Sequence, residues 1–125
     1  MKAEVIISAE GGGMKTSETR VAGELDIKGA GYTLAYEWEG DKTLVVYDGK
    51  TLTSTRVGGV NLSLKFARGK YTDCKIMLSG GEGVFRVYTT ELKTKINSTS
   101  VETRLKYIND NEKLNLNIKA ITEKS

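Results

Sequence analysis

Few residues in this chain could do chemistry, because its 125 residues include no histidine. The absence of histidine excludes a Ser-His-Asp triad, a Cys-His dyad and the common histidine-ligated zinc and iron sites. The carboxylates of Glu37, Glu39 and Asp41 could hold a hard cation or act as an acid–base pair. We interpret them as a solvated strand end instead, since Glu37 and Glu39 face away from the neighbouring aromatic residues. The sequence therefore predicts no catalytic residue, no metal site and no cofactor, and we expect a protein that is not an enzyme.

A stripe of large side chains on even positions points to a different chemistry, the binding of a small molecule. Tyr32, Tyr36 and Trp38 alternate with small or acidic residues, so they share one face of a strand. In a barrel this stripe either lines a lumen wide enough for one small ligand or fills it. Arg56 has the inward phase of Leu52, so its guanidinium either points inward as an anchor for an anion or reaches the rim. The candidate lumen residues are Tyr32, Tyr36, Trp38, Arg56, Phe66 and Phe85.

Cations in the second half of the chain form a third candidate site. Residues 1–62 carry 7 Lys or Arg against 9 Asp or Glu, whereas residues 63–125 carry 12 against 7. A basic stripe could attract nucleic acid or an acidic protein if its strands are neighbours. The stripe lacks the interleaved aromatic residues that stack bases, and Glu91 and Glu102 interrupt it, so we do not expect nucleic-acid binding. Its members are Lys93, Lys95, Arg104, Lys106, Lys113 and Lys119.

Hairpin signals indicate how these residues are positioned. Asp48-Gly49 separates two alternating runs and predicts a tight type I′ turn. At the C-terminal end, residues 101–107 and 114–120 alternate on either side of a turn at 109–112. Between them the apolar phase changes from odd positions at Phe85 to even positions at Leu92, which predicts a β-bulge near Thr89-Thr90-Glu91. Glycine clusters at 11–13, 58–59 and 80–83 predict further turns.

The whole pattern predicts one all-β domain over residues 1–125. We count nine or ten short strands with close turns, no stretch of helical period and no linker. An open sheet of this many strands curls, and closing it removes the exposed edges, so we predict an antiparallel up-and-down barrel. The chain has no proline, which would delete donors from the strand ladders.

The single cysteine and the absence of long apolar segments bear on the compartment. Cys74 has no partner for an intrachain disulfide, and a reducing interior is its natural environment. No segment resembles a signal peptide or reaches the ~20 apolar residues needed to span a bilayer. We therefore expect a cytoplasmic protein without a membrane partner.

From Tyr36 onward the chain resembles a family of small, uncharacterised bacterial proteins, the YwiB-like family, whose members adopt a lipocalin-like (calycin) barrel. The resemblance lies in Tyr36-Glu37, Arg56-Val57-Gly58, Phe66-Ala67-Arg68-Gly69 and Gly83 followed by Phe85, Val87 and Thr89. Relatives tend to carry a Tyr-x-Thr before a proline-containing turn where this chain has Leu78-Ser79-Gly80-Gly81. The resemblance implies a lipocalin-like fold and no established activity.

These observations lead to two hypotheses on function. The first is a non-enzymatic binding module that holds a small, partly apolar or anionic ligand inside the barrel. The alternative is an interaction module that binds nucleic acid or protein through the basic C-terminal strands. Poorly paired strand edges at the glycine-rich rim would invite pairing with another copy, so we also predict a homodimer, with a monomer as the alternative.

Overall fold

The computed structural model describes residues 1–11 and 14–122 and consists of ten β-strands without a helix among those residues. The predicted all-β fold is therefore confirmed. No helix long and apolar enough to cross a membrane occurs in the described ranges. The strands are β1 (Lys2–Gly11), β2 (Met14–Lys28), β3 (Gly31–Trp38), β4 (Asp41–Tyr47), β5 (Thr51–Val57), β6 (Asn61–Ala67), β7 (Tyr71–Leu78), β8 (Gly81–Ile96), β9 (Ser100–Asn109) and β10 (Glu112–Thr122).

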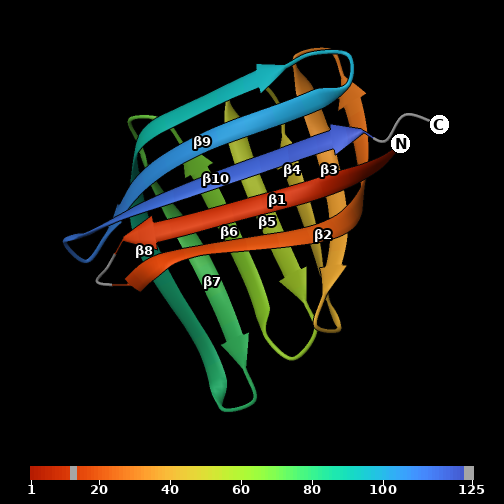
Figure 1. Cartoon of the computed structure of the whole chain (residues 1–125). Helices are drawn as coiled ribbons and strands as arrows, with labels where there is room; N and C mark the ends of the chain where they lie inside the picture. The colour runs from red at the N-terminus through yellow and green to blue at the C-terminus, as the bar shows by residue number, and fades with distance from the viewer. Residues whose placement is uncertain (12–13, 123–125) are drawn as a thin grey trace.

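The ten strands form a closed barrel in which each strand pairs antiparallel with its neighbours in sequence. Closure comes from β1 and β10, which pair along nine positions from Ala3 opposite Thr122 to Gly11 opposite Leu114. Figure 1 shows β9, β10, β1 and β2 as a front layer that crosses the layer of β3–β7 behind it. The two longest strands, β2 with 15 residues and β8 with 16, curve from one layer into the other. The predicted up-and-down barrel is confirmed.

Alternating side chains build the core between these layers. On β9, for example, Val101, Thr103 and Leu105 are buried whereas Arg104 and Lys106 are exposed. This period of two gives each strand one apolar inner face and one polar outer face. The buried hydrophobic residues are Ala3, Val5, Leu25, Tyr32, Leu34, Val45, Leu52, Phe66, Cys74, Val87, Leu92, Val101, Leu105, Ile118 and Ala120.

The predicted bulge is confirmed in β8. The register of β8 with β9 shifts between Thr89 and Glu91, so that the inward positions change from odd to even. Thr89 also holds the loop after β6, because its carbonyl accepts a hydrogen bond from the Gly69 amide at 2.8 Å. Its own amide donates to the Lys70 carbonyl at 3.2 Å. These contacts close the barrel where β6 and β7 separate, since their ladder covers only residues 61–63 and 75–77.

One hairpin turn differs from the sequence-based expectation. The β4–β5 hairpin is present, but the type I′ geometry predicted for Asp48-Gly49 is wrong, because only Gly49 has a positive φ. The Asp48 carboxylate instead accepts hydrogen bonds from the Lys50 and Thr51 amides, and this arrangement moves the turn by one residue. Positive φ at both central residues occurs in the β9–β10 turn, at Asp110 (48°) and Asn111 (68°). Of the glycine turn predicted at 11–13, residues 12 and 13 lie outside the described residues.

Candidate binding site on the outer face of the barrel

The interior of the barrel is packed with aromatic side chains. Tyr32 and Phe66, two of the candidate lumen residues, are 2% and 1% exposed. The ring of Tyr32 contacts that of Tyr47 at 5.8 Å, and the ring of Phe66 contacts that of Tyr107 at 4.9 Å. These distances are typical of packed aromatic pairs. At both of these ring contacts, packed side chains occupy the space that a ligand would need.

A short polar network crosses the buried centre. The Tyr32 hydroxyl lies 2.6 Å from Oγ1 of Thr103, which in turn lies 2.9 Å from Oγ1 of Thr94. Burial raises the pKa of Tyr32 to about 12, because the phenolate would lose its hydration there. The phenol is therefore neutral at physiological pH and acts as a structural hydrogen-bonding group.

Arg56 is held at one end of the barrel by a carboxylate. Its Nε donates to Oδ2 of Asp41 at 2.7 Å, and the Asp41 side chain is only 12% exposed. The Gly59 amide donates to the other oxygen of the same carboxylate at 2.9 Å. These hydrogen bonds, first from Gly59 and then from Arg56, hold the pKa of Asp41 below its usual range. An anion that used Arg56 as an anchor would have to displace Asp41.

The remaining candidate lumen residues do not gather around a common cavity. Trp38 ends β3 and is 42% exposed, while Tyr36 and Phe85 are half-buried and pack against the core. Burial raises the pKa of Tyr36. The six candidates therefore divide into three pairs. Two residues are buried in the core, two pack at the margin of the core, and an arginine and a tryptophan reach towards the surface.

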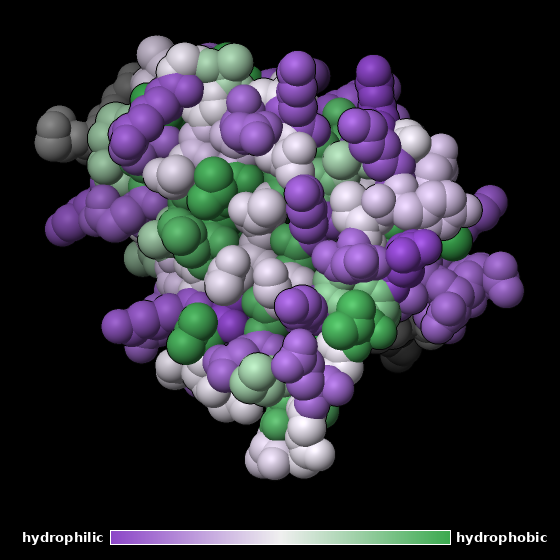
Figure 2. Space-filling view, turned by 180° about the vertical axis from the view of Figure 1, so that it is seen from behind, coloured by the Kyte–Doolittle hydropathy of each residue, from purple (hydrophilic) through white to green (hydrophobic). Residues whose placement is uncertain are grey.

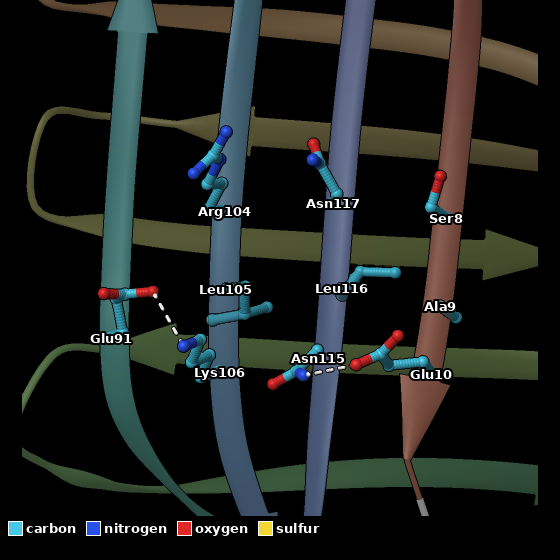
Figure 3. A pocket seen from close by; sticks show the side chains of 10 residues that line it. All are labelled: Ser8, Ala9, Glu10, Glu91, Arg104, Leu105, Lys106, Asn115, Leu116 and Asn117. Carbon is cyan, nitrogen blue, oxygen red and sulfur yellow. Dashed lines mark hydrogen bonds and ion pairs between the residues drawn. The ribbon is translucent and has the colours of Figure 1, made fainter. Parts of the chain in front are cut away.

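A hollow lies on the outside of the barrel, across the outer faces of β8, β9, β10 and β1. We call it the outer groove; its volume is about 390 Å³, within the range of small-molecule sites. Figure 3 shows its side chains in two rows separated by the inward residues Leu105 and Leu116. Strand register produces the rows: Glu91, Lys106, Asn115 and Glu10 are successive cross-strand partners, and so are Arg104, Asn117 and Ser8.

The charged side chains of the first row take part in ion pairs and hydrogen bonds. The Glu91 carboxylate forms ion pairs with Lys93, at 3.2 Å, and with Lys106, at 3.9 Å. The side-chain amide of Asn115 donates a hydrogen bond to the Glu10 carboxylate at 3.1 Å. Exposed pairs of this kind each contribute about 0–1 kcal/mol to stability. Their importance here is that both lysines beside Arg104 already have a carboxylate partner.

The second row contains groups without such partners. Within the described part of the chain, Arg104 makes no ion pair or side-chain hydrogen bond. Oδ1 of Asn117 is buried and accepts no hydrogen bond, while its Nδ2 reaches Glu102 only at 3.5 Å. The Ser8 side chain lies beside Asn117. The side chains of Arg104, Asn117 and Ser8, which carry a guanidinium, an amide and a hydroxyl, thus line the same hollow.

The basic residues singled out in the sequence share this side of the barrel. Lys93 and Lys95 lie on β8, Arg104 and Lys106 on β9, and Lys113 and Lys119 on β10. These strands are neighbours, as the stripe required. Sequence reasoning missed Ser8, Asn115 and Asn117, because their approach to the stripe depends on the pairing of the first strand with the last. Their outward phase was visible in the alternation; their neighbours were not.

The described residues contain no group of three or more Asp, Glu or Cys side chains arranged to hold a metal ion. Glu37 and Glu39 are exposed near the turn after β3, while Asp41 turns to Arg56. The three carboxylates therefore do not form a cluster.

Comparison with known proteins identifies the family and supports the fold. The model of a domain of unknown function, DUF1934, matches residues 2–119. The crystal structure of the ywiB protein from Bacillus subtilis is similar, with a TM-score of 0.82 and 22% sequence identity. The alignment covers 98% of this chain and 91% of the ywiB chain. No curated protein matches the sequence. The predicted resemblance to the YwiB-like family is thus confirmed, and the identity is low enough that the similarity speaks for the fold alone.

Proposed function

We propose, for a chain that belongs to the DUF1934 family of domains of unknown function, a non-enzymatic binding role in which a small anionic molecule occupies the outer groove. The observation that carries this proposal is Arg104, which has no carboxylate partner among the described residues although both neighbouring lysines are paired with Glu91. A planar guanidinium with free donors binds a carboxylate or a phosphate through two parallel hydrogen bonds.

The other groups in the second row refine the class of ligand. The buried Oδ1 of Asn117 needs a donor, and an unsatisfied buried acceptor costs about 1–3 kcal/mol. Rotation of the Asn117 side chain would bring this oxygen into the groove. There a hydroxyl or ammonium group next to the anionic group of the ligand would satisfy it while the anion binds Arg104. The Ser8 hydroxyl can donate to the same anion. The proposed ligand is therefore a small molecule with a carboxylate or phosphate beside a hydrogen-bond donor.

A nuclear magnetic resonance titration tests this site. Glycerol 3-phosphate and inorganic phosphate are added to the ¹⁵N-labelled protein, and we expect amide shifts to concentrate at Ser8, Arg104 and Asn117. Glycerol 3-phosphate should bind more tightly, because it also offers a hydroxyl donor. Amide shifts spread evenly over the lysine-rich surface, or an equal response to both anions, would contradict the proposed site.

A pair of charge-neutral variants separates the groove from general attraction to a basic surface. Arg104→Met should weaken binding of glycerol 3-phosphate by at least about tenfold, since a charge-assisted bidentate contact is lost. Lys119→Met removes the same charge from an exposed position on β10, so its affinity should stay within about twofold of wild type. Equal losses in the two variants would show that only net charge matters.

Binding of nucleic acid or an acidic protein through the same strands is the second candidate. The contiguity of β8, β9 and β10 supports it. However, the exposed Tyr71 and the half-buried Tyr88 pair with each other on β7 and β8 before the bulge. Their rings contact each other at 4.8 Å instead of standing apart for bases to stack between them. A titration with single-stranded RNA at low salt should therefore give a flat response.

Binding of a small, partly apolar molecule inside the barrel stays a prediction. The packed pairs Tyr32–Tyr47 and Phe66–Tyr107 weigh against it, since a ligand would have to separate them. Trp38 is the single tryptophan, so its fluorescence offers a direct check with a hydrophobic probe such as 1-anilinonaphthalene-8-sulfonate. A saturable change in Trp38 emission that survives Arg104→Met would favour the interior over the outer groove.

A further inference from the structure

The outer side of β3–β7 carries a surface of a different kind. One cross-strand row runs through Ala35, Leu44, Thr55 and Ser63, none of which is charged. Val57 and Met77 belong to the next outward row towards the end of the barrel, where Lys42 lies opposite Val57 and Glu82 opposite Met77. We call the six residues Ala35, Leu44, Thr55, Ser63, Val57 and Met77 the neutral face. Figure 2 views the molecule from this side and shows white and green side chains around the centre, with several purple side chains among them and more towards the margins.

Large apolar side chains stand exposed on the neutral face. Leu44 is 46% exposed, Val57 is 59% exposed and Met77 is 49% exposed. Val57 and Met77 line a shallow, almost entirely apolar groove of about 200 Å³ with Thr55 and Ser63. Grouped apolar residues of this kind, as distinct from single ones, mark surfaces that are covered in the working molecule.

Two opposite charges border this groove. Lys75 follows Ser63 in the same cross-strand row, and Glu82 lies opposite Met77 on β8. Both line the groove, and within the described part of the chain neither makes an ion pair. The patch therefore has an uncharged centre, and on this margin Lys75 and Glu82 have no ion-pair partner among the described residues.

We propose that the neutral face is the interface of a two-fold homodimer. In a two-fold contact the same patch meets itself, so the uncharged centre brings no like charges together. The symmetry that brings Lys75 towards the partner's Glu82 also brings Glu82 towards the partner's Lys75. The neutral face is thus complementary to a second copy of itself. Further charges of both signs border it, with Glu24 opposite Ala35 and Lys42 opposite Val57, so its margin does not favour a partner of one sign.

The dimensions of the face are suitable for such a contact. Five strands at about 4.8 Å spacing and seven residues at about 3.3 Å rise give a sheet of roughly 20 by 23 Å. Two such faces in contact cover roughly 900 Å² in total, which is the size of a weak, concentration-dependent interface. Dimerisation through this face differs from the strand-edge pairing expected from the sequence, because every strand in the closed barrel already has two neighbours. It also leaves the outer groove, on the other side of the barrel, open.

Sedimentation velocity and light scattering test the assembly. We expect a mass that rises with concentration from 13.7 kDa towards twice that value at micromolar protein. Thr55→Glu introduces two facing charges at the centre of the two-fold contact and should keep the protein monomeric. Ser8→Glu is the matched control, since it makes the same chemical change on the opposite layer and should leave the dimer intact. A wild-type mass that stays at 13.7 kDa over the whole range would overturn the proposal.

A charge exchange tests the two-fold geometry itself. Lys75→Glu or Glu82→Lys alone would set like charges against each other twice per dimer, and we expect the dimer dissociation constant to rise at least about tenfold. The double variant Lys75→Glu/Glu82→Lys should restore dimerisation to within about threefold of wild type. Circular dichroism on each variant checks that the barrel is folded. A double variant as monomeric as the singles would rule out this pairing, and a dimer disrupted by Ser8→Glu but not by Thr55→Glu would move the interface to the other layer.

Discussion

The two outer sides of this barrel differ in chemistry although they enclose the same core. The outer groove on β8, β9, β10 and β1 combines cations, carboxylates and amides, and Arg104 lies there without an ion-pair partner among the described residues. The neutral face on β3–β7 has threonine, serine and aliphatic residues at the equivalent outward positions. Inward positions must be apolar on both sides because they fill the same interior, whereas outward positions are free to differ. The difference teaches that function in this fold should be sought on the outward half of each strand.

The largest expected effect comes from a residue that supports both sides. Phe66→Ala removes a buried ring that packs against Tyr107, and it should lower the free energy of unfolding by about 3–5 kcal/mol. Val57→Ala removes apolar atoms from the neutral face, and in the monomer its effect should stay within about 0.5 kcal/mol. Urea denaturation of dilute protein measures both. Similar losses in the two variants would mean that inner and outer positions are not separable as we describe.

A smaller effect is expected from the polar network beneath both sides. Tyr32→Phe removes the hydroxyl that contacts Thr103, but Thr103 keeps Thr94 as a partner, so the loss should be about 0.5–1.5 kcal/mol. The variant should also change the alkaline limb of stability. The pKa of Tyr32 is raised to about 12, above its unfolded value of about 10, so the wild type should lose stability as the pH rises from about 10 to about 12.

Thermal unfolding between pH 8 and pH 12 tests this assignment. In Tyr32→Phe the decline above pH 10 should be shallower than in the wild type, because one buried phenol no longer has to ionise. Tyr71→Phe is the matched control, since Tyr71 is 69% exposed and its ring stays in water. An unchanged alkaline limb in Tyr32→Phe would assign the decline to other groups.

Features that depend on neighbouring residues could be predicted from the sequence, whereas features that depend on contacts between distant strands, such as the pairing of β1 with β10, could not. The bulge near Thr89 and the barrel follow from the alternation of apolar residues and from its change of phase, both of which are local signals. The turn at Asp48 was misjudged by one residue because its carboxylate, and not backbone conformation alone, caps the Lys50 and Thr51 amides. The outer groove could not be predicted, because Ser8 meets Asn117 only when β1 pairs with β10. Likewise, the sequence leaves open where Arg56 points, and Asp41 determines the answer.

The smallest effect should come from the ion pair between Asp41 and Arg56 at the end of the barrel. Asp41→Asn replaces the carboxylate that accepts hydrogen bonds from Gly59 and Arg56 with a neutral amide. Because the folded pKa of Asp41 is lowered, its stabilising contribution is fully present above the unfolded pKa of about 4. That contribution is lost as the pH falls through the lowered folded value. The wild type should therefore be more stable than Asp41→Asn at neutral pH, and the two should converge below about pH 4. Asp110→Asn, in the exposed β9–β10 turn, is the control and should follow the wild type throughout. Melting curves at pH 7 and pH 3 suffice, and a gap between wild type and Asp41→Asn that persists unchanged at pH 3 would show that the carboxylate charge is not what stabilises this end of the barrel.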